Sequence, residues 1–400
     1  MVDERNWASM LTAAGLFSDG FEGIEGLWKS ALPGLSEALR HVPVRSSISR
    51  LILESRLADA RSQVDYSLSS TTSKLRSLLS ETQFSHWVAE SSQYQLLHEY
   101  VMRTDSNLVN GLFLEFDEPS GPSMPSVFVT TSEYGRKKLL RSTIASRVLS
   151  LERREPSDLL DSVFMDMGRT FWAGNAGLNR TQAAVRRALT EFVLQANDSF
   201  MVAQLGFWLA RDTSMVRVVA ENDIVQNNPE YYEHVTRWWE HARSDLQQIG
   251  WRWGKDGVKT PLDEVMPQLM HSGPSHFDFG INVGVDGVQP KIGFEIYFHD
   301  DVMQDALAGV HGPRHPDLMN FLSTAQRLGL CTPAYVEALR PIAASKVPRT
   351  ARLGADSYKL EAELNHIKLT FEPGVRPELK AYVSIVAVKT QAHSPSDTEL

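Results

Sequence analysis

The most constraining feature of the chain is a pair of segments near its C-terminal end, 366–371 and 380–385, in which polar and apolar residues alternate. A period of two is typical of a β-strand with two different faces. The apolar faces carry Ile, Leu, Phe, Ala and Val. The polar faces carry cations and hydroxyl groups and no acid: His366, Lys368, Thr370, Lys380, Tyr382 and Ser384. Such a face indicates either a solvated surface or the wall of an anion-binding site.

Three earlier segment pairs show the same two-sided pattern and predict further hairpins: 112–117 with 126–131, 201–210 with 215–221, and 276–285 with 291–298. Asp286-Gly287 between the last two segments is a strong hairpin-turn signal. Helices with clear start signals are expected after the hairpins, for example at Thr260-Pro261, His315-Pro316 and Thr332-Pro333. The chain therefore repeats an architecture of hairpin and helices, without strong identity between the units.

The first hundred residues are predicted to be helical. Apolar residues recur at roughly helical spacing over 48–79, and a further helix is expected over 87–101. We expect a helical N-terminal region over 1–105, a sheet domain over 106–390 and a disordered polar tail over 391–400.

Composition narrows the classes of partner. A hydrophobic content of 42% is that of a globular protein with a large core. The net charge of −9 and the lack of a basic run argue against nucleic acid. No apolar run reaches the roughly 18 residues that span a bilayer, so no membrane partner is expected. A single cysteine favours a cytoplasmic protein.

The bulky apolar faces of the four hairpins need covering, and the helices are available for that. If the strands close into a ring, the polar faces line its interior, where Gly280, Gly284 and Gly293 leave room beside a ligand. The predicted fold class is therefore α+β: an antiparallel β-barrel of repeated αββα units with helices outside and a polar lumen. The alternative is an open antiparallel sheet with helices on one face and water on the other.

Two short motifs in this pattern suggest a family. Lys380-Ala381-Tyr382 and Leu114-Glu115-Phe116, set in an αββα barrel, resemble the soluble aromatic prenyltransferases, including the fungal indole type. In that family Lys-x-Tyr strands bind an allylic diphosphate, and a Glu on an early strand accepts a proton from the aromatic nucleophile. The resemblance covers 111–388 as an architecture. Arg217-Val218-Val219 and Lys291-Ile292-Gly293 depart from it, because each has one cation and no paired Tyr.

The resemblance implies a transferase that moves a prenyl group from an allylic diphosphate to an aromatic or amine acceptor in natural-product biosynthesis. The partners implied are the diphosphate and a small aromatic or peptide acceptor. Glu115 is the expected catalytic base, since its apolar neighbours would raise its pKa. The substrate-binding candidates are Arg217, Lys291, Glu295, Tyr297, His366, Lys368, Lys380 and Tyr382.

Two alternatives stay open. Glu295, Asp117, Asp278 and Asp300-Asp301 offer hard oxygen ligands, but they lack a recognised metal-binding spacing. We therefore expect no cofactor, with Mg²⁺ as the open alternative, and assign no metal ligand. The other alternative is a non-catalytic protein of a biosynthetic pathway that binds a peptide or small molecule. Convergence of the polar faces favours the enzyme, and an open sheet favours the binding protein.

Overall fold

The structure is a computed structural model of the 400-residue chain. It describes residues 6–14, 50–58, 64–71, 109–116, 126–131, 200–208, 215–222, 260–271, 276–284, 286–298, 315–344, 347–353 and 356–390, with a few positions at 36, 102 and between 239 and 251.

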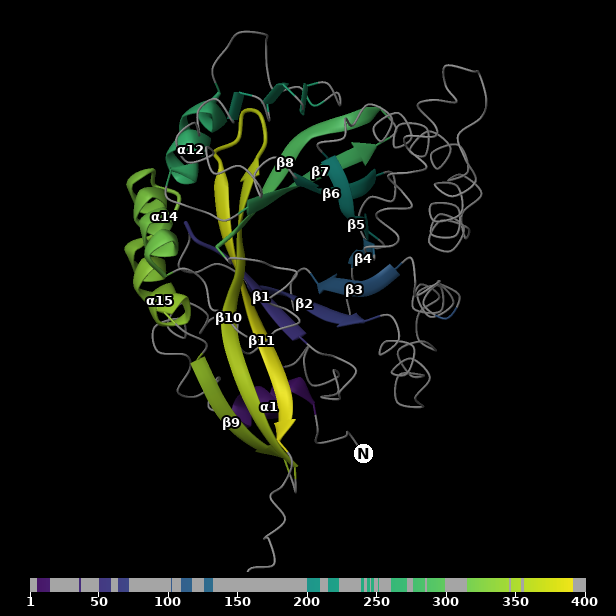
Figure 1. The fold of residues 1–400 in the computed structure, drawn as a ribbon, viewed down its shortest axis with the longest axis vertical. Helices are drawn as coiled ribbons and strands as arrows, with labels where there is room; N and C mark the ends of the chain where they lie inside the picture. The colour runs from purple at the N-terminus through teal and green to yellow at the C-terminus, as the bar shows by residue number, and fades with distance from the viewer. Residues whose placement is uncertain are drawn as a thin grey trace, which may run out of the picture.

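Within these ranges eleven antiparallel strands form one sheet, in the order β11-β1-β2-β3-β4-β5-β6-β7-β8-β10-β9. Strand β11 also pairs with β10, which closes the sheet into a ring that contains every strand except β9 (Figure 1). The predicted antiparallel barrel is therefore confirmed, and the open sheet is excluded. The strands are β1 (Arg50–Arg56), β2 (Val64–Thr71), β3 (Val109–Phe116), β4 (Ser126–Thr131), β5 (Phe200–Trp208), β6 (Met215–Asn222), β7 (His276–Gly284), β8 (Gly287–Tyr297), β9 (Val347–Leu353), β10 (Asp356–Phe371) and β11 (Glu378–Thr390).

The four predicted hairpins are β3–β4, β5–β6, β7–β8 and β10–β11. Two of their turns place a glycine in the left-handed region, Gly287 at φ 95° and Gly374 at φ 79°. The last hairpin is much longer than the sequence pattern predicts. The first half of β10 pairs with β9, and its second half pairs with β8. The β10–β11 ribbon therefore extends beyond the ring (Figure 1).

The prediction of helix over 48–79 is wrong, because β1 and β2 lie in that range and join the ring. In β2 the buried residues Val64, Tyr66 and Leu68 alternate with polar ones, as in a strand. The barrel therefore begins at Arg50 instead of 106. Helix α1 (Trp7–Ala13) precedes it. The helix predicted over 87–101 and the tail over 391–400 lie outside the described residues.

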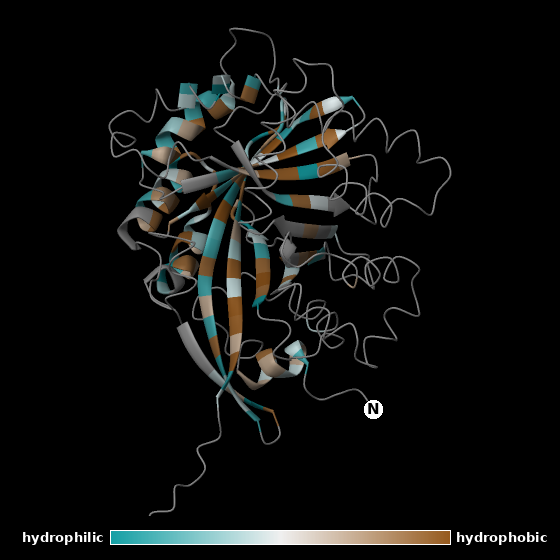
Figure 2. Ribbon diagram, turned by 45° about the vertical axis from the view of Figure 1, so that its right-hand side comes forward, coloured by the Kyte–Doolittle hydropathy of each residue, from teal (hydrophilic) through white to brown (hydrophobic). Residues whose placement is uncertain are grey.

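Helices α12 (Pro261–Met270), α14 (His315–Arg327) and α15 (Pro333–Ala344) lie along the outside of the barrel (Figure 1). All three begin at the sites that the sequence predicts. Aromatic contacts fix the apolar outer face of the strands: Trp239 with Phe294, Phe298 with Phe321, and Trp251 with Phe371. Hydrophilic and hydrophobic bands alternate along the strands (Figure 2), as a wall with two different faces requires.

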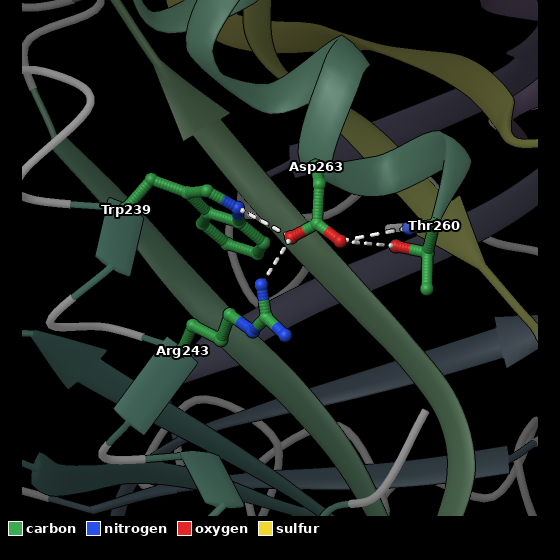
Figure 3. A network of polar contacts seen from close by, with 4 residues as sticks. All are labelled: Trp239, Arg243, Thr260 and Asp263. Carbon is green, nitrogen blue, oxygen red and sulfur yellow. Dashed lines mark hydrogen bonds and ion pairs between the residues drawn. The ribbon is translucent and has the colours of Figure 1, made fainter. Parts of the chain in front are cut away.

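One carboxylate joins two of the outer segments. Asp263, in the first turn of α12, accepts hydrogen bonds from the backbone and hydroxyl of Thr260 at 2.8 and 3.0 Å. It also accepts from the Trp239 indole at 3.1 Å and the Arg243 guanidinium at 3.2 Å (Figure 3). Because the Trp239 ring packs edge-on against Phe294, this network anchors the outer face of β8.

Candidate functional site

Six charged side chains from six strands meet inside the barrel and form what we call the interior charge cluster. They are Glu54 of β1, Glu115 of β3, Arg217 of β6, Glu295 of β8, Lys368 of β10 and Lys380 of β11. The fields of Glu54, Lys368, Arg217 and Lys380 all act on Glu115, although β3 pairs with none of their strands. Only side chains that project inward from a closed sheet can meet in this way. The polar faces predicted from the hairpins therefore converge.

The first ion pair of the cluster joins Lys368 and Glu295, which lie directly opposite each other on β10 and β8. The ammonium lies 3.2 Å from the carboxylate, and the side chains are only 11% and 10% exposed. The hydroxyl of Tyr297 donates to the same carboxylate at 3.4 Å. Burial opposes ionisation of Glu295, but the electrostatic effects of Lys368, His366 and Arg217 outweigh burial and lower its pKa to about 2.

The second ion pair joins Lys380 to Glu54, across the β11–β1 seam that helps to close the ring. Glu54 is 3% exposed, and its buried Oε2 atom has no hydrogen-bond partner among the described residues, although the Tyr382 hydroxyl acts to lower its pKa. Burial alone would raise the pKa of Glu54, but Lys380, Lys368 and Tyr382 give a net lowering. Glu54 is thus held as a carboxylate. The pKa of Lys380 is raised, because attraction to Glu54 outweighs burial.

Glu115 has the opposite electrostatic environment. Burial and the neighbouring charge of Glu54 raise its pKa, and the attraction of Lys368, Arg217 and Lys380 does not fully compensate. Two carboxylates with pKa values shifted in opposite directions are a typical arrangement for proton transfer.

Arg217 lies against two glycines of the neighbouring strands. A Cβ added at Gly280 would lie 2.3 Å from the Arg217 Nη2 atom, and one at Gly293 would lie 2.7 Å from it. The in-phase glycines of β7 and β8 therefore make room for this guanidinium. Among the described residues Arg217 forms no ion pair, and its buried Nε atom has no hydrogen-bond partner.

Three rings lie beside the charges. The imidazole of His366 stacks on the Tyr382 ring with centroids 4.1 Å apart and an interplanar angle of 19°. Tyr297 approaches the same imidazole at 5.2 Å. The Lys368 ammonium lies 5.5 Å from the centroid of Tyr382. Of the three rings, that of Tyr382 thus lies within cation–π distance of the Lys368 ammonium.

The structure brings together Glu115, Arg217, Glu295, Tyr297, His366, Lys368, Lys380 and Tyr382 from the predicted set. It does not bring Lys291 to them. Lys291 is half-exposed and lies 4.0 Å from Glu372, which directly follows β10. Sequence reasoning missed Glu54, because its segment was read as helix. The alternation in Val64–Ser69 next to it was the signal for a strand hairpin.

In the described part of the chain, no group of three or more His, Cys, Asp and Glu side chains is placed to hold a metal ion. Asp117, Asp300 and Asp301 lie outside that part. The expectation of no cofactor, with Mg²⁺ as the alternative, stays a prediction. None of the described helices is both long enough and apolar enough to cross a bilayer.

No protein-family model matches the sequence, and no curated protein does. Solved structures that match include 5-dimethylallyltryptophan synthase from Streptomyces coelicolor, at 11% identity and a TM-score of 0.48, covering 95% of this chain and 98% of that one. Prenyltransferase PriB in its apo form matches at 9% identity and a TM-score of 0.47, covering 94% of this chain and 95% of that one. The 6-dimethylallyltryptophan synthase from Micromonospora olivasterospora, in complex with DMASPP and Trp, matches at 11% identity and a TM-score of 0.46. The match covers 94% of this chain and 96% of that one.

Proposed function

We propose that the protein transfers a prenyl group from an allylic diphosphate to an aromatic acceptor inside the barrel. The observation that supports this most is the convergence of Arg217, Lys368 and Lys380 with Glu115 in one closed interior. Cations for an anionic leaving group and a carboxylate with a raised pKa are the two chemical requirements of such a reaction. Natural-product biosynthesis is the context that we expect for it.

The cations and the aromatic rings would bind the prenyl donor and stabilise its ionisation. Arg217 and Lys368 lie on the same stretch of wall, since both approach the Gly293 position. They would bind the diphosphate and stabilise the charge that it gains as the allylic C–O bond breaks. The rings of Tyr382 and Tyr297, beside Lys368, would stabilise the allylic cation by cation–π contact.

The carboxylates would take part in the reaction of the acceptor. An aromatic carbon or nitrogen attacks the allylic carbon, the new bond forms, and the acceptor loses one proton. We assign that proton to Glu115, because its raised pKa makes it a stronger base than Glu54. Glu54 stays ionised beside Lys380, and its charge favours the protonated form of Glu115 after transfer.

A second candidate is a protein that binds a small molecule or peptide without catalysis. The two ion pairs favour it, because Lys368 and Lys380 already contact carboxylates of the chain. An interior of mixed charge would suit a zwitterion such as an amino acid or a short peptide. In that case a ligand binds, and no covalent product forms with any donor.

The test is a transfer assay with dimethylallyl or geranyl diphosphate and a panel of indoles, phenols and aromatic peptides, followed by mass spectrometry. We expect an acceptor whose mass rises by one prenyl group, and retention of activity in EDTA. Glu115→Gln should lower kcat by about 100-fold or more, with donor affinity unchanged.

Glu54→Gln tests the assignment of the base: if it removes the acid limb of the pH profile and Glu115→Gln keeps it, the two roles are reversed. Acceptor binding without product would favour the second candidate.

A further inference from the structure

This inference rests on the proposed function. We propose that Glu295 is a built-in competitor for the donor's diphosphate group. It neutralises Lys368 when no diphosphate is bound, gives Lys368 up to the incoming donor, and pairs with Lys368 again to speed the departure of inorganic diphosphate after transfer.

The position of the Glu295 carboxylate carries the proposal. It lies among the donors that an anionic ligand would use: the Lys368 ammonium at 3.2 Å and the Tyr297 hydroxyl at 3.4 Å, with Arg217 and His366 acting on it as well. Its side chain is only 10% exposed. The wall therefore already contains one anion of its own at the cationic site, and a diphosphate must compete with it.

Arg217 supplies the place where a diphosphate can first bind. Gly293 lies beneath both cations, since a Cβ there would meet Arg217 Nη2 at 2.7 Å and Lys368 Cε at 3.1 Å. Within the described residues Arg217 has no carboxylate partner, whereas Lys368 is paired with Glu295. A diphosphate held by Arg217 is thus next to Lys368 and can replace Glu295 as its partner.

The other interior pair differs in a way that singles out Glu295. Glu54 is paired with Lys380 by the closer contact, and its side chain is 4% exposed, against 10% for Glu295. Glu295 has one close cation and a long hydrogen bond from Tyr297, a neighbour on the same strand. Arg217 and Lys368 approach the same Gly293 position, so an anion bound at Arg217 meets the Lys368–Glu295 pair, and Glu295 is the exchangeable carboxylate.

The experiment compares wild type with Glu295→Gln, which keeps the side-chain size and removes the charge. Isothermal titration calorimetry with inorganic diphosphate should show about tenfold tighter binding to the variant, because the competing anion is gone. In rapid-quench assays the variant should show a burst of one product per site followed by slow turnover, as expected when release of diphosphate limits the rate. The matched control is Glu372→Gln, which removes an equal charge at the half-exposed Lys291 pair and should change neither result.

Unchanged or weaker diphosphate binding by Glu295→Gln, in a wild-type background that transfers prenyl groups, overturns the inference and leaves the proposed function standing. If neither protein binds inorganic or allylic diphosphate, the proposed function fails and the inference fails with it. Circular dichroism confirms that each variant is folded. Should Glu295→Gln not fold, Glu295→Asp moves the carboxylate back by one methylene. It should then bind diphosphate more tightly than wild type by a smaller factor, and no increase would again overturn the inference.

Discussion

Two acids on opposite faces of the barrel wall, Asp263 and Glu295, have similar surroundings and different uses. Each carboxylate lies 3.2 Å from one cationic group, and the side chains are 7% and 10% exposed. Asp263 lies outside the barrel, where four donors from three residues share its two oxygens. Glu295 lies inside, with one close cation and one distant hydroxyl.

The difference shows what a buried ion pair can be for. Outside, the partners of Asp263 are the cap of α12 and a tryptophan that packs on β8, so the pair holds elements in place. Inside, the partners of Glu295 come from strands that the backbone ladder already holds together. The interior pair is therefore not needed to build the barrel. Its removal should change ligand binding and pH dependence more than architecture.

The largest expected effect on stability is that of Asp263→Ala. The change removes the cap of α12 and leaves the Trp239 and Arg243 donors without this partner, which should lower the free energy of unfolding by about 3–4 kcal/mol. Urea denaturation measures it. The matched control is Glu264→Ala, which removes an exposed acid from the same helical turn and should cost only a few tenths of a kcal/mol. Equal losses for both variants would mean that the network in Figure 3 stabilises nothing.

The second effect is that of Glu295→Gln, whose stability cost should depend on pH. The pKa of Glu295 is lowered from 4.5 to about 2, so its ionised form stabilises the fold above pH 4.5. That stability is lost as pH falls from 4.5 toward about 2. We expect a deficit on the order of 2 kcal/mol at pH 7, closing over that acid range, in urea titrations at several pH values. A deficit independent of pH would show that the loss is one of packing and not of charge.

Much of this architecture could be predicted from the sequence, because a strand with one apolar and one polar face repeats with a period of two. That pattern located four hairpins and the convergence of their polar faces. It failed at β1, where Leu51, Ile52 and Leu53 are all buried and follow no alternation, so Glu54 was missed. It also failed to separate Lys291 from Glu295. Both residues are in phase on β8, but Lys291 lies beside the turn that follows β10, where it pairs with Glu372.

A third, smaller effect of opposite sign is expected for Glu115→Gln. The pKa of Glu115 is raised in the folded protein, so its ionised form costs stability once pH rises above 4.5 and through the folded pKa. At neutral pH the neutral amide should therefore stabilise the protein, while lowering kcat. Thermal unfolding at pH 5 and pH 8 measures the difference. A variant less stable than wild type at pH 8 would contradict the raised pKa.

The smallest effect should be that of Lys291→Met. Its ion pair with Glu372 is 4.0 Å long and half-exposed on both sides, so its loss should cost less than about 0.5 kcal/mol. Urea denaturation at low and high salt measures this. A larger cost would indicate that Lys291 has a role that the observed ion pair does not explain.

The most direct measurement is the binding of dimethylallyl diphosphate to wild type, Lys368→Met and Lys291→Met by calorimetry. The two variants remove the same charge from opposite environments, one inside the barrel and one at its edge. We predict binding to wild type, at least about tenfold weaker binding to folded Lys368→Met, and unchanged binding to Lys291→Met. Equal affinities for all three proteins, or a loss confined to Lys291→Met, would contradict the placement of the donor site in the barrel interior.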